Sequence, residues 1–227
     1  MRDQSLPPGT TTSHQPVMAE EVVTMLAPAP GSLQIDATLG GGGHTERILE
    51  ATDPDGRLLG LDADGAAIAR VRERLAPRFG DRLHLRQANF RELSVVAPEE
   101  GFGTVDGCLF DLGLSSFQLA DAERGFGIRT GGPLDMRFDA DRGTPASELL
   151  ETLDARELAS LFRRYGEEPF AGRIARAIVE TRATAPVQTA EDLASLIERV
   201  APARAPCPAT SDPPRPSWSS SPSRRPP

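Results

Sequence analysis

Short apolar runs alternate with helical stripes along the first half of the chain, and this alternation leaves few folds open. The strand-type runs occupy residues 32–36, 57–62, 83–87 and 105–111. Helical stretches at 43–51 and 64–78 separate the first three runs. The runs at 57–62 and 105–111 are almost continuously apolar, which is typical of parallel strands buried on both faces. The pattern predicts an α/β fold with a Rossmann-like, doubly wound parallel sheet.

The periodicity changes after residue 115. Residues 116–144 are rich in Gly, Asp and Arg and are expected to form loops, whereas residues 145–200 have only helical periodicity. Asp154 with Glu157, and Thr189 with Asp192, have the spacing of capping boxes that begin two helices. From residue 201 onward proline and serine dominate, which predicts disorder. We therefore expect a sheet domain at 1–115, a helical module at 116–202 and a disordered tail at 203–227.

Composition excludes several classes of protein. The two cysteines, Cys108 and Cys207, are far apart and have no metal-binding spacing, which rules out a disulfide scaffold and argues against a zinc site. No apolar run approaches the roughly 18 residues of a membrane span, and no signal peptide is visible, so a cytoplasmic setting without a membrane is expected. The net charge of −8 argues weakly against a nucleic-acid partner, although local basic patches can be hidden within it.

The segment between the first predicted strand and the first helix carries four successive glycines, residues 40–43, after Asp36. Glycines allow close approach of a ligand, and a helix N-terminus offers N–H groups. The dinucleotide fingerprint fails because Thr45 occupies the place of its third glycine, and a phosphate-binding loop fails for lack of a lysine. An acid followed by glycines suits a cofactor with a cationic end near Asp36, such as S-adenosylmethionine. The alternative is a simple tight turn.

Three further residues lie at or just after the carboxyl ends of predicted strands. Asp62 is placed to accept hydrogen bonds from ribose hydroxyls, whereas its alternative role as a helix N-cap fits Asp64 better. Phe90 is either a stacking partner for adenine or a core side chain. Asp111 lies where a transferred group is expected, unless it only caps a turn.

His44 has no ligand partner three or four residues away, so it is expected to contact the backbone or a cofactor rather than a metal. Several arginines of the helical module form either a phosphate-facing patch or an ordinary solvated face. These are Arg163, Arg164, Arg173, Arg176 and Arg182.

Taken together, the motifs resemble one family, the MraW-like small-subunit ribosomal RNA methyltransferases H. The resemblance covers roughly residues 14–202 of the chain. The matching stretches are residues 14–18, 36–44, 60–64, 110–118, 123–126, 132–137 and 165–168.

The resemblance implies S-adenosylmethionine-dependent methylation of the exocyclic N4 of a cytidine in the decoding centre of 16S rRNA, with the small ribosomal subunit as partner and no metal. It implies that residues 1–115 begin the methyltransferase domain and that the helical module is an insertion that helps to recognise RNA. In this chain we expect the Asp111 side chain to lie nearest the target amine, where it orients the amine or accepts its proton. Asp135 and Arg137 are expected to form walls of the substrate pocket or to contact RNA. The implied cofactor contacts are Gly42, Gly43, His44, Asp62, Phe90, Asp111 and Gln118.

The sequence also departs from the family pattern. Phe117 stands where proline is common, and the return of the chain into the sheet after the helical insertion is absent. We therefore expect the last strands to be missing and hypothesise a truncated or frameshifted family member. Two alternatives are a methyltransferase of the same fold that acts on a small molecule or protein, and an inactive truncated fragment. No pattern in the sequence indicates an oligomeric state.

Overall fold

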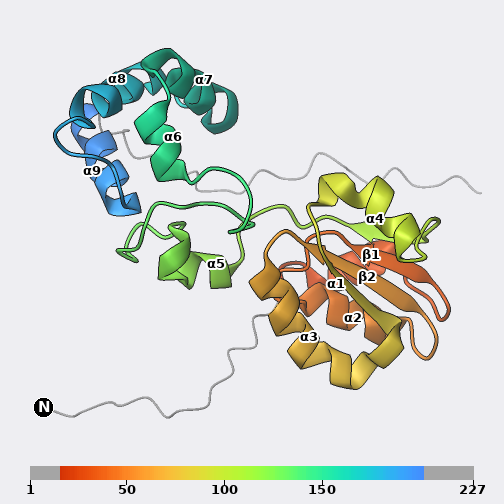
Figure 1. The fold of residues 1–227 in the computed structure, drawn as a ribbon. Coiled ribbons are helices and arrows are strands. Elements are labelled where there is room, and N and C mark those ends of the chain that lie inside the picture. Colours follow the sequence, from red (N-terminus) through yellow and green to blue (C-terminus); the bar gives the residue numbers. More distant parts are fainter. Residues whose placement is uncertain (1–15, 202–227) are drawn as a thin grey trace, which may run out of the picture.

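The computed structural model describes residues 16–201, and their first half forms a parallel sheet between helices (Figure 1). The strands pair in the order β3-β2-β1-β4, and every pairing is parallel. The predicted α/β, Rossmann-like sheet is therefore confirmed. Residues 14 and 15 of the first matching stretch and the predicted tail lie outside the described residues. The strands are β1 (Leu33–Asp36), β2 (Arg57–Asp62), β3 (Leu83–Gln87) and β4 (Gly107–Leu109).

Successive side chains of β2 point to opposite faces of the sheet and so belong to different cores. Leu58 packs with apolar side chains of two helices on one face, while Leu59 and Leu61 pack with the helix on the other face. Each such buried side chain contributes about 1.5–3 kcal/mol to folding. The helices of the first face are α1 (Ala19–Leu26), α2 (Gly43–Ala51) and α3 (Gly65–Phe79), and α4 (Leu93–Glu99) covers the second (Figure 1).

Two predictions for the sheet domain and the segment that follows it were wrong. The strand expected at 105–111 is limited to β4, which is only half-buried because it pairs with β1 alone and so forms an edge of the sheet. The segment expected to be loops contains a short helix, α5 (Ser116–Ala120), which a capping box between Ser115 and Gln118 begins. Helices α1 and α4 were not predicted. Three single-turn 3₁₀ helices complete this part: η1 (Gly80–Arg82), η2 (Phe90–Glu92) and η3 (Ala122–Arg124).

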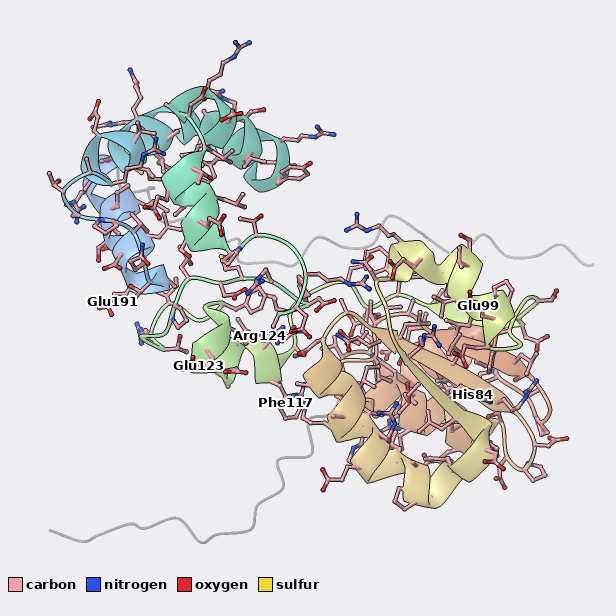
Figure 2. All side chains as sticks on the ribbon, viewed as in Figure 1. His84, Glu99, Phe117, Glu123, Arg124 and Glu191 are labelled. Atoms are coloured by element: carbon pink, nitrogen blue, oxygen red, sulfur yellow. The ribbon has the colours of Figure 1, made fainter. Side chains whose placement is uncertain are left out.

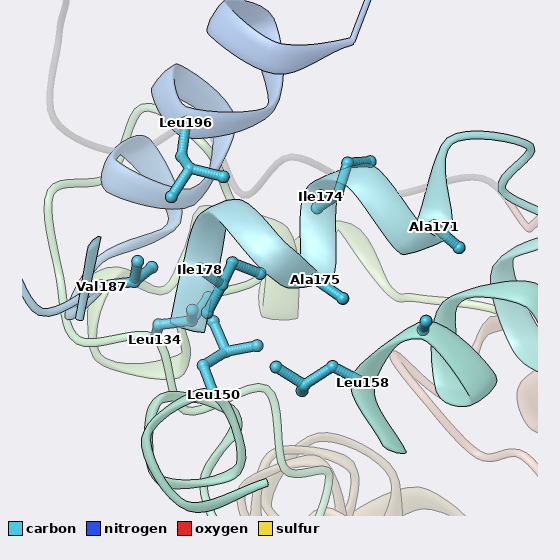
Figure 3. Close-up of a cluster of buried hydrophobic side chains, with 10 residues drawn as sticks. Leu134, Leu150, Leu158, Ala171, Ile174, Ala175, Ile178, Val187 and Leu196 are labelled. Carbon is cyan, nitrogen blue, oxygen red and sulfur yellow. The ribbon is translucent and has the colours of Figure 1, made fainter. Parts of the chain in front are cut away.

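The part of the chain from Ala146 to Val200 is helical, as predicted for residues 145–200, and has a core of its own. Figure 1 shows these helices gathered apart from the sheet, with α5 between the two parts. Ile178, at the centre of the core, is fully buried beside Leu150 and Leu196 (Figure 3). Both predicted capping boxes are present, at Asp154 and Thr189. The helices are α6 (Ala146–Thr152), α7 (Ala155–Gly166), α8 (Ala171–Thr181) and α9 (Ala190–Val200).

The segment between the two parts joins the helical core through Leu134. This side chain is buried in that core, and its backbone N–H donates to the Gln188 carbonyl at 2.7 Å. Its neighbour Pro133 forms an antiparallel bridge with Thr189. The connection therefore belongs structurally to the helical module at this point. Within residues 16–201, no helix has the length and apolar character needed to cross a membrane.

Candidate functional site

The glycine turn lies at the carboxyl ends of neighbouring strands. Leu39 donates its N–H to the Leu61 carbonyl at 2.8 Å, which fixes the turn to the end of β2. Gly42 precedes α2 with a φ of 73°, and a Cβ there would lie 2.8 Å from a Val71 methyl group. A glycine is required at this position both by the left-handed backbone and by the packing of α3. The turn is therefore held rigidly at the edge where ligands of such sheets bind.

Asp36 is buried beneath the glycine turn, whereas the acid-then-glycine pattern predicted it near the cationic end of a cofactor. Its side chain is only 1% exposed. Thr45 donates its hydroxyl to one carboxyl oxygen at 2.7 Å, and the Thr38 N–H donates to the other at 3.2 Å. Burial raises the pKa of Asp36 above the ordinary aspartate value. This residue stabilises the turn from beneath.

Asp62 is fixed at the end of β2 by two backbone donors. The Gly40 N–H donates to one carboxyl oxygen at 2.8 Å and the Asp64 N–H to the other at 2.9 Å. Burial raises the pKa of Asp62, while these two hydrogen bonds oppose the rise. The helix-capping role belongs to Asp64, which accepts from the Ala66 N–H. A carboxylate has about four acceptor positions, so Asp62 retains acceptor capacity for ligand hydroxyls.

His44 and Asp111 meet beside the glycine turn. His44 lies in the first turn of α2 and is buried, and its Nε2 is 3.7 Å from a carboxyl oxygen of Asp111. The Asp111 side chain is 59% exposed, and the Thr38 hydroxyl accepts a 2.7 Å hydrogen bond from its N–H. Among the described residues, no group hydrogen-bonds to the buried Nδ1 of His44. The pair therefore presents an accessible carboxylate and an unsatisfied imidazole nitrogen.

Phe90 is a surface aromatic, so its interpretation as a core side chain was wrong. It is 43% exposed and meets Phe110 edge to face, with 5.9 Å between the ring centroids. Phe90 begins η2, just after the segment that follows β3, and Phe110 directly follows β4. Two exposed rings at the same edge of the sheet can contact the face of a planar heterocycle.

Gln118 is buried by contacts within the protein. Its amide nitrogen lies 3.4 Å from an Asp64 carboxyl oxygen, and its amide oxygen accepts the Ser115 N–H. Its neighbour Phe117 lies against the glycine turn, where a Cβ added to Gly41 would be 3.2 Å from the ring. The structure thus places α5 directly over the turn. Pro16 covers Gly43 in a similar way, at 3.0 Å from a Cβ added there.

Asp135 and Arg137 pair with each other. Two nitrogens of the guanidinium donate to the two carboxyl oxygens, at 2.8 and 2.6 Å. This pairing lowers the pKa of Asp135. Within residues 16–201, no hydrogen bond or ion pair joins either side chain to Asp62 or Asp111. The two predicted groups are therefore not brought into direct contact.

Arg124, which was not predicted from the sequence, connects the Asp135–Arg137 pair indirectly to the sheet edge. Its guanidinium lies 3.3 Å from an Asp64 carboxyl oxygen and donates to the carbonyl oxygens of Arg137 and Phe138, the former at 3.0 Å (Figure 2). Its side chain is only 13% exposed. Arg124 therefore holds the segment that contains Asp135 against the sheet domain. The only indication of this role in the sequence was that Arg124 lies in the matching stretch 123–126.

Among the arginines of the helical module, Arg182 has a structural role. Its guanidinium donates to the carbonyl oxygens of Leu150 and Leu153 and so joins α8 to the end of α6. Within the described part of the chain, no three His, Cys, Asp or Glu side chains gather as a set of metal ligands.

The parallel sheet, the glycine turn and the carboxylates at its carboxyl edge define a Rossmann-like α/β domain. The comparison of sequences specifies this further. The chain belongs to the MraW methylase family, which it matches over residues 11–210.

Relatives with the name ribosomal RNA small subunit methyltransferase H support this assignment. The protein from Thermomicrobium roseum is 53% identical over 194 residues, which cover 86% of this chain and 59% of that protein. The protein from Syntrophotalea carbinolica is 48% identical, covering 83% of this chain and 60% of its own length. The chain thus spans about 60% of the length of these curated relatives.

Proposed function

We propose that the chain carries the cofactor site and part of the substrate site of an S-adenosylmethionine-dependent methyltransferase, which modifies the exocyclic N4 of a cytidine in 16S rRNA. The names of the relatives support a small-subunit rRNA substrate. The observation that carries the chemistry is the exposed carboxylate of Asp111 beside His44 and the glycine turn. An enzyme with this substrate works where ribosomes are assembled, in the cytoplasm of a bacterial cell.

The residues present fit the cofactor. Asp62 has acceptor capacity for ribose hydroxyls and is held in place by two backbone N–H groups. Phe90 and Phe110 offer ring edges and faces for an adenine. The unsatisfied Nδ1 of His44 is a further polar atom for a ligand or an ordered water. When bound, S-adenosylmethionine supplies an electrophilic methyl group on a sulfonium centre.

The protein must mainly position the acceptor amine. An amine conjugated to a pyrimidine ring is a poor nucleophile, so holding it in line with the methyl group supplies much of the acceleration. The target base has to leave its stack to reach the sheet edge. Asp111 is exposed and held from behind by Thr38, and its carboxylate can orient the amine and accept its proton. The Nε2 of His44 lies 3.7 Å from that carboxylate.

Calorimetric titration with S-adenosylmethionine tests the cofactor site. We expect saturable binding by the full chain and a loss of about tenfold or more in affinity for Asp62→Ala, which removes charge-assisted hydrogen bonds. Asp53→Ala is the matched control, because Asp53 is an exposed acid just beyond the C-terminal end of α2, and this variant should bind normally. Absence of binding by the unaltered, folded chain would reject the cofactor assignment.

Incorporation of labelled methyl groups into isolated small-subunit rRNA tests the substrate. We expect Asp111→Asn to lower transfer far more than it lowers cofactor affinity, because Asp111 is assigned to the amine. Digestion of the labelled RNA to nucleosides should place the label on the N4 of cytidine. Cofactor binding combined with transfer to a small molecule or a protein instead of rRNA would favour an enzyme of the same fold with another substrate.

A further inference from the structure

Helix α5 rests on the sheet domain through few side chains. Within this helix only Gln118 is buried, whereas Phe117 and Leu119 are 40% and 45% exposed. The residues just before it, 112–114, are exposed as well. A segment with so little buried apolar surface opens locally at a small cost in free energy. The contacts that hold α5 in place therefore determine how often this segment leaves the sheet domain.

The ring of Phe117 makes one of these contacts, between α5 and the sheet domain (Figure 2). It lies against Gly41 of the glycine turn, and the Arg70 guanidinium of α3 lies over it, 4.8 Å from the ring centroid. This distance is within the range of a cation–π interaction. The Nε and one terminal nitrogen of Arg70 are buried and hydrogen-bond to no group within residues 16–201. The guanidinium therefore depends on the ring face and on an Asp64 carboxyl oxygen 3.9 Å away.

A second arginine of α3 holds the glycine turn itself. Arg74 donates a terminal N–H to the Gly41 carbonyl at 2.9 Å and also pairs with Glu46 of α2. Residues four apart lie on the same face of a helix, so Arg70 and Arg74 point to the same side of α3. One face of α3 therefore fixes the turn directly and fixes α5 through Phe117.

Gln118 makes the other contact, and the two contacts flank Asp62. The amide nitrogen of Gln118 lies 3.4 Å from an Asp64 carboxyl oxygen. The N–H groups of Gly40 and Asp64 are the two donors that fix the Asp62 carboxylate. Phe117 contacts the glycine that follows Gly40, while Gln118 contacts Asp64 itself. Helix α5 is therefore attached on both sides of the carboxylate that is assigned to the ribose hydroxyls.

We propose that Phe117 is a positioning residue, which latches α5 beside Asp62 and thereby sets the rate at which S-adenosylmethionine enters and leaves its site. The latch is the contact of the Phe117 ring with Arg70 and Gly41. The inference deepens the proposed function and rests on it for the identity of the ligand. Segments that cover a binding site commonly limit the rates of entry and release. A ring that only filled space on the surface would affect stability and leave these rates unchanged.

Surface plasmon resonance with S-adenosylmethionine over the immobilised full chain measures both rate constants. We expect Phe117→Ala to raise the dissociation rate constant about tenfold, because it removes the aromatic partner of Arg70. The association rate constant should rise as well, since an open α5 admits the ligand as readily as it releases it. The affinity then falls by a smaller factor than the dissociation rate rises. Unchanged rate constants in the alanine variant would overturn the proposal.

Further variants separate the aromatic ring from apolar contact in general. Phe117→Tyr keeps the ring, and its rate constants should stay within about twofold of those of the unaltered chain. Phe117→Leu keeps apolar contact without a ring and should release the cofactor nearly as fast as the alanine variant. Arg70→Gln should also accelerate release, but it should add little to Phe117→Ala, because both changes remove the same contact. Fully additive effects of these two changes would contradict the latch.

The matched control is a second contact of the same kind, distant from the glycine turn. In α7 the Arg164 guanidinium lies over the ring of Tyr165, 5.4 Å from its centroid, and the tyrosine is exposed. Tyr165→Ala should leave both rate constants unchanged. Equal acceleration by Tyr165→Ala and Phe117→Ala would reject a role that is specific to α5.

Amide hydrogen exchange without cofactor tests the latch by itself. The N–H groups of Leu119 and Asp121 donate to the carbonyl oxygens of Ser115 and Phe117. Phe117→Ala should accelerate exchange at these two amides while β1 and β2 keep their protection. Alanine has a higher helix propensity than phenylalanine, so faster exchange reports the loss of the latch and not a weaker helix.

The two measurements together distinguish this inference from the proposed function. Binding of S-adenosylmethionine with unchanged rate constants and unchanged exchange rejects the latch and keeps the cofactor assignment. Faster exchange in Phe117→Ala, from a folded parent chain that binds no S-adenosylmethionine, rejects the cofactor assignment and the gating role with it. Faster exchange together with faster release supports both.

Discussion

The protonation state of Asp62 governs how well this residue can accept ribose hydroxyls. Burial raises its pKa above the ordinary value of 3.8, so it takes up a proton at a higher pH than an exposed aspartate does. We expect the affinity for S-adenosylmethionine to fall as the pH is lowered through that raised pKa, because protonation removes an acceptor. Calorimetric titrations over a pH series measure this, and Asp62→Asn should bind weakly with a flatter profile over the same range.

The same raised pKa affects stability in the opposite direction. Because the folded-state pKa lies above the unfolded value, the contribution of Asp62 to stability is complete below the unfolded value and is lost as the pH rises through the folded one. Cofactor affinity and stability therefore have opposite pH trends at this residue. A pH profile of affinity that simply followed the stability of the chain would contradict the assignment of Asp62 to the cofactor.

Gly42 offers a second prediction for a single residue. Its φ of 73° and its contact with Val71 both oppose a side chain, whereas Gly131 has a nearly equal φ of 71° and open space around it. We expect Gly42→Ala to destabilise the chain by about 2–4 kcal/mol, and Gly131→Ala by about 1 kcal/mol. Urea unfolding measures both free energies. Equal losses would show that backbone strain alone, and not the packing of α3, requires glycine here.

The sequence predicted which residues lie at the sheet edge better than it predicted what they contact. Asp62 ends β2 and Asp111 lies just after β4, and a parallel sheet necessarily brings such positions to one edge. The burial of Asp36 beneath Thr45 could not be predicted, because it depends on the orientation of α2. The role of Arg124 in linking the connecting segment to the sheet domain was missed for a similar reason, because its partner Asp64 is 60 residues away in the chain.

At the scale of single elements, local signals in the sequence were sufficient to predict a helix and its first residue wherever capping residues and apolar periodicity agreed. Helix α7 begins at Asp154, as predicted, because the aspartate accepts from two backbone N–H groups while Glu157 accepts the N–H of Asp154. Strand β4 is shorter than its apolar run because strand length at an edge depends on the available partner. Periodicity describes the side chains of a segment and carries no information about its neighbours.

The capping box of α7 gives a prediction for this element. Asp154→Ala should destabilise the helical module by about 1 kcal/mol, since it leaves N-terminal N–H groups without an acceptor. Asp154→Ser keeps a capping oxygen and should recover most of the loss. Thermal unfolding followed by circular dichroism compares the three proteins. A serine variant as unstable as the alanine variant would show that the charge of Asp154, and not its capping hydrogen bonds, stabilises α7.

At the scale of the whole molecule, two cores are joined mainly by the connecting segment. One core holds the sheet and its helices, and the other holds α6 to α9 together with Leu134. Arg124 links this segment to Asp64 in the sheet domain. The two parts are therefore expected to unfold with different stabilities, as separate cooperative units often do.

Ile178→Ala tests this independence. The side chain is fully buried in the helical core, and its truncation should cost about 2–5 kcal/mol there. We expect amide hydrogen exchange to accelerate in α6 to α9, while the amides of β1 and β2 keep their protection and the affinity for S-adenosylmethionine stays unchanged. Leu59→Ala, which is as fully buried in the sheet domain, is the matched control and should give the converse pattern. If Ile178→Ala accelerated exchange in both parts equally, the two cores would have to unfold as one unit, and the helical module could not be altered without disturbing the cofactor site.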